Sequence, residues 1–328
     1  MLEGIASDAT MPGVSFAISR DGSLAYVPGK PVGNAARLLR VDRAGVTRPL
    51  TDLRRLFAAL ALSPDGRRLA LEISAPNSQI WVYDLERGTL TPQTRRFNNS
   101  NPIWTPDGRR LTFTSNRDGP SNLYWQPADG SGPVERLTRG GQPETSQQAE
   151  SWSPDGKVLV FSETTSSTKD ELWLLRMDGD RRPQPLFPGQ SGVGGAGVSP
   201  NGRWLAYVSV ESGRDEIYVK PLSGSGGHWP ISGDGGEFPV WSRDGGELFY
   251  RSGDRTMAVT IGRGAAFSAT KPRKIFEAKT PANSDKPYDV TPSGEFVVIA
   301  PAESETPFAQ VNVVVNWFQE VRPRVAAR

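Results

Sequence analysis

The residues of this sequence that could do chemistry are polar and aromatic side chains placed shortly before a recurring turn. They are Asn99, Asn101, Gln148, Glu150, Glu237, Phe238, Tyr288 and Asp289. Carboxylate and amide oxygens are the ligands that Ca²⁺ takes in proteins, which makes Glu150, Glu237 and Asp289 candidate metal ligands. A cation held there could act as a Lewis acid on an ester, a lactone or a phosphotriester. Without a metal, the same residues could bind a ligand and leave it unchanged.

The composition argues against most other kinds of catalytic site. The chain has 328 residues, no cysteine and a single histidine, His228, so it offers no disulfide, no thiolate metal ligand and no His-rich zinc site. The G-x-S-x-G pattern of serine hydrolases is also missing. The formal net charge is +2, from 38 basic and 36 acidic residues. This balance gives no electrostatic reason to expect a nucleic acid as partner.

The sequence shows neither a membrane-spanning nor an export segment. No apolar run approaches the ~20 residues that a transmembrane helix needs. The first residues, MLEGIASDATMPG, lack the basic and apolar regions of a signal peptide. We therefore expect a soluble, monomeric chain that does not insert into a membrane.

A turn of the form Ser/Thr-x-x-Gly recurs seven times and sets the organisation of the chain. The copies are Ser19–Gly22, Ser63–Gly66, Thr105–Gly108, Ser153–Gly156, Ser199–Gly202, Ser242–Gly245 and Thr291–Gly294. Successive glycines are 42 to 49 residues apart, a period typical of propeller blades. Proline suits the second position of a type I turn, aspartate suits the third, and glycine then takes a left-handed conformation. We therefore interpret the aspartates of this motif as turn residues and not as catalytic groups.

The segments on either side of each turn predict β-strands. A large apolar residue precedes each final glycine by four positions, as Trp104 and Trp152 do, and runs such as RRLTFTS and KVLVFSE follow it. β-branched and aromatic residues in runs bounded by Gly, Asp, Asn and Pro are typical of strands. Four strands in a repeat of ~45 residues make one blade of a β-propeller. We predict an all-β fold with four-stranded antiparallel blades, seven in number, with six as the alternative.

The blades are expected to form a single domain over residues 1–328. Their ranges are about 12–51, 57–94, 99–138, 148–187, 195–232, 237–276, and 286–320 plus 1–10. The last repeat lacks an outer strand, and MLEGIASDATMPGVSFAISRDG aligns with IFEAKTPANSDKPYDVTPSG. A strand around Leu2–Gly4 is therefore predicted to join the C-terminal blade and close the ring. In the alternative, six blades are accompanied by an edge hairpin.

The segment PIWTPDGRRLTFTSNRDGPSNLYWQPADGSGPVERLT resembles the repeat of TolB-like propellers, also called the PD40 or WD40-like repeat. Its three turns, T-P-D-G, S-N-R-D-G and A-D-G-S-G, stand in the order of that family and are followed by R-L-T. The resemblance covers nearly the whole chain and is strongest over the second to fifth repeats. It implies a propeller, and the related prolyl oligopeptidases place such a propeller beside a hydrolase domain that this sequence lacks.

More narrowly, three segments are similar to the C-terminal sensor propeller of bacterial membrane-anchored Ser/Thr protein kinases. They are LSPDGRRLALEI with IWVYDLERGTLT, PVWSRDGGELFYRSGDRTMAV, and VNVVVNWFQEV. This resemblance implies an extracytoplasmic location in bacteria and a ligand of undefined identity. The kinase motifs H-R-D and D-F-G are missing here, so kinase activity is not expected of this chain.

The propeller prediction places the candidate site residues at the mouth of a central channel. Innermost strands begin there, and the eight residues precede their turn glycines by five to nine positions. Solvation of the mouth is the simplest explanation for polar side chains in these places. We favour a binding module without catalysis, whose mouth takes a peptide, a protein or a small ligand. The alternative, which leaves the question of enzyme activity open, is a Ca²⁺-dependent hydrolase resembling propeller lactonases or phosphotriesterases.

Overall fold

The protein is described by a computed structural model of the whole chain. The described residues are 7–8, 13–14, 16–19, 22–26, 35–74, 76–139, 145–165, 170–223, 226–282, 284–302, 312–315 and 317. The chain divides into two compact units: Arg37–Ala300, and Met1–Ala36 together with Pro301–Arg328. All elements in the described residues are β-strands. These ranges contain no helix with the length and apolar composition that crossing a bilayer requires.

The larger unit consists of six four-stranded antiparallel sheets, which we call blades 1 to 6 in chain order of their innermost strands. Blade 1 has β7 (Phe57–Leu62), β8 (Arg68–Ser74), β9 (Ser78–Asp84) and β10 (Thr89–Pro92). Blade 2 has β11 (Asn99–Trp104), β12 (Arg110–Ser115), β13 (Asn122–Pro127) and β14 (Glu135–Arg136). Blade 3 has β15 (Ser146–Trp152), β16 (Val158–Thr164), β17 (Glu171–Arg176) and β18 (Pro183–Pro185).

The other three blades follow the same order from the inside outward. Blade 4 has β19 (Val193–Val198), β20 (Trp204–Ser209), β21 (Glu216–Pro221) and β22 (Trp229–Pro230). Blade 5 has β23 (Glu237–Trp241), β24 (Glu247–Ser252), β25 (Arg255–Thr260) and β26 (Arg273–Glu277). Blade 6 has β27 (Tyr288–Val290), β28 (Phe296–Pro301), β5 (Ala36–Val41) and β6 (Thr47–Arg55).

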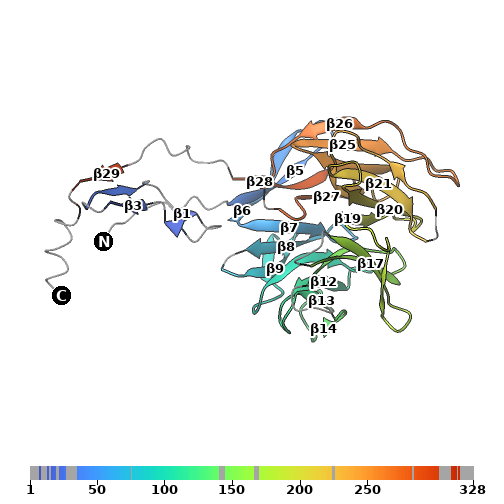
Figure 1. The fold of residues 1–328 in the computed structure, drawn as a ribbon, viewed down its shortest axis with the longest axis horizontal. Helices are drawn as coiled ribbons and strands as arrows, with labels where there is room; N and C mark the ends of the chain where they lie inside the picture. The colour runs from blue at the N-terminus through green and yellow to red at the C-terminus, as the bar shows by residue number, and fades with distance from the viewer. Residues whose placement is uncertain are drawn as a thin grey trace. The chain divides into compact units, whose positions relative to one another are not determined.

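The blades form a closed ring within this unit. The innermost strand of each blade contacts that of the next, and β27 of blade 6 contacts both β23 and β7. Figure 1 shows β7, β19 and β27 near the middle of the unit and β14 and β26 at its periphery. Between blades 6 and 1, Leu60 N donates to Lys286 O at 3.1 Å and Asp285 N donates to Ala58 O at 3.0 Å. The segment that leads into β27 therefore pairs directly with the first inner strand.

The core lies between neighbouring blades. Trp104 of blade 2 is buried with Ala61 and Val82 of blade 1, and Trp152 of blade 3 is buried with Leu123 of blade 2. These tryptophans occupy the predicted position four residues before the turn glycine. Their indole nitrogens also cross to the preceding blade: Trp104 Nε1 donates to Ala61 O at 2.9 Å. Apolar packing and these hydrogen bonds together hold adjacent sheets, whose innermost strands belong to separate hydrogen-bonded ladders.

The described residues give six four-stranded sheets, the number in the alternative of the sequence analysis, together with a three-stranded and a two-stranded sheet. Blade 6 is completed by residues 36–55, which follow the first repeat's turn, and not by residues 1–10. The predicted strand around Leu2–Gly4 lies outside the described residues. Ile18, the first repeat's counterpart of Trp104, is 43% exposed, whereas the counterparts in the six blades are all buried.

The first repeat forms part of the smaller unit. There β3 (Phe16–Ile18) pairs with β4 (Leu24–Tyr26), which also pairs with β29 (Asn312–Val314) from the end of the chain. The described part of this unit also contains a two-stranded sheet, β1 (Ser7–Asp8) with β2 (Gly13–Val14). An N-terminal and a C-terminal segment therefore pair in a three-stranded sheet of this unit, through residues 24–26 and not through the strand predicted around Leu2–Gly4.

The recurring turn has the predicted construction. In Ser153–Gly156, Gly156 N donates to Ser153 O at 2.9 Å, and Asp155 Oδ1 accepts from Ser153 Oγ at 2.6 Å and from Lys157 N at 3.1 Å. All seven turn glycines have positive φ, between 66° and 87°, which glycine adopts without the steric cost of a Cβ. The hydrogen bond from Ser153 is the main cause of a lowered pKa for Asp155. The aspartate is thus a turn residue.

Candidate functional site: the central channel

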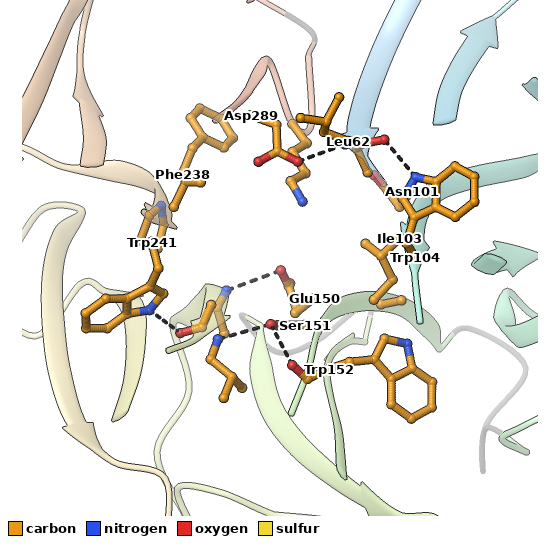
Figure 2. A pocket seen from close by; sticks show the side chains of 18 of the residues that line it. Leu62, Asn101, Ile103, Trp104, Glu150, Ser151, Trp152, Phe238, Trp241 and Asp289 are labelled. Carbon is orange, nitrogen blue, oxygen red and sulfur yellow. Dashed lines mark hydrogen bonds between the residues drawn. The ribbon is translucent and has the colours of Figure 1, made fainter. Parts of the chain in front are cut away.

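The innermost strands of all six blades surround a channel with a cavity volume of about 490 Å³. One end, which we call the strand-start end, is lined by Asn101, Gln148, Phe238, Asp285 and Lys286. The other, which we call the turn end, is lined by Pro64, Pro106, Pro154, Pro200 and Arg243 of the recurring turns. Figure 2 shows Glu150, Asp289 and Ile103 around the space between these ends.

β-Bulges control which side chains of the inner strands line the channel. Pairing between the first two strands shifts register in blades 1 to 5, for example between Ser100 and Ile103 and between Glu237 and Val240. A bulge inserts an unpaired residue and redirects its side chain. Asn101, Gly195 and Phe238 occupy the same register, seven residues before their turn glycines, and all have left-handed backbone, with φ of 52°, 53° and 54°.

Phe238 is the most unusual of these three residues. A bulky residue with positive φ is a conformational outlier, and the cost is about 1–2 kcal/mol relative to glycine. The backbone is held in place by Tyr288, whose hydroxyl donates to Phe238 O at 2.8 Å. Tyr288 itself is 1% exposed and does not line the cavity, and burial raises its pKa well above the ordinary value. Tyr288 therefore positions Phe238.

Asn101 is held between two carboxylates that sequence analysis did not single out. Its backbone N donates to Glu72 Oε2 at 3.0 Å, and a side-chain hydrogen bond joins it to Asp285. Glu72 is 4% exposed, and burial, with a smaller contribution from the Asp285 charge, raises its pKa. Burial likewise raises the pKa of Asp285. The Oδ1 atom of Asn101 is buried without a hydrogen-bond partner among the described residues.

Glu150 is a partly buried carboxylate inside the channel. Its Oε2 accepts from Ala196 N at 3.2 Å, which links blade 3 to blade 4. Burial raises the pKa of Glu150 to about 7, although hydrogen bonds from Ser162 and Ala196 and the charge of Lys286 oppose the shift. Gln148 lines the channel on the same strand. Near neutral pH the carboxyl of Glu150 is therefore close to half-protonated.

Asp289 also bridges two blades. Its Oδ2 accepts from Leu62 N of blade 1 at 2.9 Å, and its Oδ1 accepts from Val290 N at 2.8 Å. Ser151 of blade 3 does the same, because its Oγ accepts from Val198 N of blade 4 at 3.0 Å. Several polar residues of the channel thus satisfy backbone amides that neighbouring ladders leave open, as buried N–H groups require.

Besides Tyr288, two of the predicted site residues do not line the cavity, Asn99 and Glu237. Asn99 is fully buried; its Nδ2 donates to Arg96 O at 2.7 Å, and its Oδ1 accepts from Arg117 at 3.2 Å. Glu237 stands at the start of β23 opposite Arg251 and is exposed. Partial desolvation of its carboxyl, with a smaller contribution from the charge of Asp215, raises the pKa of Glu237. Asn101, Gln148, Glu150, Phe238 and Asp289 are the predicted residues that the structure brings together.

Four residues that belong to the channel or support it were missed by sequence analysis: Glu72, Asp285, Lys286 and Arg243. Glu72 could have been noticed in the sequence, because it is an acidic residue inside the apolar run RLALEIS. Arg243 could also have been noticed, because it stands where the turns of the other five blades have proline. Asp285 and Lys286 precede their turn glycine by nine and eight positions, the spacing that singled out Asn99 and Glu237.

The candidate metal ligands do not form a metal site in the described part of the chain. No group of three or more His, Cys, Asp or Glu side chains is gathered there closely enough to hold a cation. Asp289 uses both carboxylate oxygens on backbone amides, and Glu150 uses one. Glu237 lies outside the cavity lining. The geometry consequently gives no support to a hydrolase that works through Glu150, Glu237 and Asp289.

Comparison with known proteins gives consistent matches to one family. A family model described as the TolB beta propeller domain matches residues 3–180. Tricorn protease homolog 1 of Streptomyces coelicolor is 29% identical over 181 residues, which are 55% of this chain and 16% of that protein. The Tol-Pal system protein TolB of Wolinella succinogenes is 30% identical over 128 residues, 38% of this chain and 29% of that protein. The chain thus spans less than a third of either relative.

A solved structure gives the same fold. The structure of a putative TolB from Agrobacterium tumefaciens superimposes with a TM-score of 0.68 at 19% identity, covering 82% of this chain and 99% of that one. At this identity the likeness concerns the fold alone. It agrees with the closed ring of antiparallel blades in residues 37–300.

Proposed function

The chain belongs to the TolB β-propeller domain family, and we propose that its propeller is a binding module that takes a polypeptide partner at the strand-start end of the channel, without catalysis of its own. The observation that supports this most directly is the left-handed backbone of Asn101 and Phe238 at that end. Backbone strain of this kind gathers at sites that clamp ligands.

Folding stability does not explain why Asn101 and Phe238 occupy these two left-handed positions. Gly195 adopts the same backbone conformation in the same register of blade 4, and glycine does so without strain. Asn101 and Phe238 instead place an amide and a phenyl ring at the rim of the cavity. An aromatic anchor beside exposed polar groups is the usual composition of a binding hot spot.

The rest of this end complements an extended polypeptide. Gln148 offers an amide donor and acceptor for peptide groups, Phe238 offers an apolar surface, and Asp285 and Lys286 provide both charges. Relatives of the chain include a protease homolog and a component of the Tol-Pal system. Their names are compatible with a propeller that contacts other polypeptides.

The proposal can be tested by selecting random dodecapeptides displayed on phage against the whole purified chain. We expect enriched peptides to bind the wild type and to lose at least about tenfold in affinity against a double variant, Asn101→Gly with Phe238→Gly, because a lost hot-spot contact costs more than about 1.4 kcal/mol. Glycine fits both backbone conformations, so this variant should stay folded.

The matched control is Val46→Ala, which shortens an exposed apolar side chain in the turn between β5 and β6. Selected peptides should bind this control as they bind the wild type. Retained binding in the folded glycine double variant would contradict the proposal, and so would an equal loss in the Val46→Ala control.

Two narrower expectations remain part of the proposal. On the resemblance to kinase-linked sensor propellers, we propose that the domain works outside the cytoplasm and acts as a monomer. Light scattering of the purified chain over a range of concentrations tests the second point, and a concentration-dependent increase in mass would contradict it.

A further inference from the structure

The recurring turns differ from one another at one position that lines the channel. Five of the six turns in the ring have proline as their second residue: Pro64, Pro106, Pro154, Pro200 and Pro292. The turn of blade 5 has Arg243 there. The turn is otherwise the same, because Gly245 N donates to Ser242 O at 2.9 Å and Ser242 Oγ donates to Asp244 at 2.7 Å.

Folding alone favours proline at this position. Proline presets the backbone of the second residue in a type I turn, and it lowers the entropy of the unfolded chain. The turn of blade 5 therefore lacks the stabilising proline and has a cation in its place. Arg243 lines the turn end of the channel beside Pro64 and Pro200.

The guanidinium of Arg243 reaches across the channel. Its Nη2 donates to Leu62 O of blade 1 at 3.4 Å, a long hydrogen bond near the limit of the ordinary range. Blade 6 lies between these two blades in the ring. The side chain thus extends over the turn end instead of folding back on its own blade.

Neighbouring carboxylates are committed to other groups. Asp244 pairs with Arg263 at 3.8 Å, and both oxygens of Asp289 accept backbone amides. Within the described ranges, Arg243 has no ion pair with a carboxylate, so most of its donors face the cavity or solvent. Proline rings of the other turns line the same end of the cavity, and apolar walls of this kind strengthen an ionic hydrogen bond.

We infer that Arg243 makes the turn end a binding site for the carboxylate of a slender, partly apolar ligand whose remainder extends into the channel. A planar guanidinium matches a carboxylate in a bidentate manner. Ile103, Gly197 and Val240 line the channel beyond it, and a volume of about 490 Å³ is within the ~300–1,000 Å³ typical of small-ligand sites. Peptide C-termini and free carboxylic acids share this chemistry.

The inference concerns the end opposite to the strand-start end and does not depend on a partner binding there. It can be tested by calorimetric titration of the whole chain with acetyl-trialanine as the free acid, acetyl-trialanine amide and butyrate. We expect the free acid to bind about tenfold more tightly than the amide, the size expected of a hydrogen-bonded ionic contact. Butyrate distinguishes the sources: affinity equal to that of the free-acid peptide indicates small acids, and weaker affinity indicates peptide C-termini.

The decisive variant is Arg243→Pro, which restores the residue of the other five turns and should keep the melting temperature. It should abolish the preference for acid over amide, and the Asn101→Gly, Phe238→Gly double variant should retain that preference. If Arg243→Pro does not fold, Arg243→Gln replaces it. Equal affinity of the wild type for acid and amide, or a preference that survives in a folded Arg243 variant, would overturn the inference, as would failure of both acids to bind at millimolar concentration.

Discussion

The two ends of the channel are formed by the same six strands and follow different rules. At the turn end, apart from Arg243, most residues repeat from blade to blade and serve the turn: hydroxyl, proline, aspartate and glycine. At the strand-start end, equivalent positions hold alanine, asparagine, glycine and phenylalanine, as Ala59, Asn101, Gly195 and Phe238 show. Repetition here indicates a role in folding, and variation with strain indicates a role in binding.

The largest effect that tests this comparison is expected at Gly66 of the turn end. A Cβ at this position would lie 2.7 Å from Pro292 Cδ, and the backbone φ is +72°. Gly66→Ala should therefore destabilise the protein by about 2–5 kcal/mol, from left-handed strain and overpacking together. Urea unfolding followed by tryptophan fluorescence measures this change.

Gly156→Ala is the matched control for that variant. Its φ is +70°, but a Cβ there would meet nothing within 4 Å, so only the strain of about 1–2 kcal/mol applies. Equal losses in the two variants would show that contact between successive turns contributes nothing to the ring.

A middle-sized effect is expected from the ionisation of Glu150, and its sign distinguishes the channel wall from the turn end. The pKa of Glu150 is raised from 4.5 to about 7 in the folded protein, so the folded state holds this proton more tightly than the unfolded state does. Stability is then lost as the pH rises from about 4.5 to 7. Because the side chain is only partly buried, we expect a loss of about 2–3 kcal/mol.

Glu150→Gln should remove this loss, because the amide oxygen still accepts from Ala196 N. The variant should match the wild type near pH 4 and be more stable at pH 8. Asp155→Asn of the turn end should behave in the opposite way, since its pKa is lowered chiefly by Ser153: destabilised at neutral pH, with the difference fading below the ordinary pKa of 3.8. Unfolding curves across this pH range that show the same sign for both variants would contradict the comparison.

Local rules made most of the ring predictable from sequence, and its closure was the part they did not decide. Trp104, Trp152 and the turn glycines were predicted correctly because each depends on its neighbours in the chain. The inner hairpins around Ser19–Gly22 and Thr291–Gly294 have the same local sequence signal. The outer strands β5 and β6, within residues 36–55, could by this signal complete a blade with either hairpin, and they lie in blade 6. Which hairpin they join depends on contacts across the ring, such as Ala59 with Lys286.

Bulges explain why the site was only partly predicted. Asn99 and Asn101 are both polar and lie two residues apart, so a regular strand would place them on one face. The register shift between Ser100 and Ile103 separates them: Asn101 lines the channel, whereas Asn99 is buried against Arg117. Glu72 was missed for a different reason, because it lies on the second strand and reaches the site only through Asn101 N.

The smallest effect, and the sharpest test of the comparison, is expected for the stability of Phe238→Gly. Removing the ring loses apolar contacts of a partly buried side chain, worth about 1–2 kcal/mol, and the relief of left-handed strain returns about 1–2 kcal/mol. The free energy of unfolding should change by less than about 1 kcal/mol, measured by urea denaturation. Phe249→Ala in the core of the same blade, where the ring is fully buried, should cost about 3–5 kcal/mol. A loss at Phe238 as large as that at Phe249 would make Phe238 a folding residue and remove the distinction between the two ends.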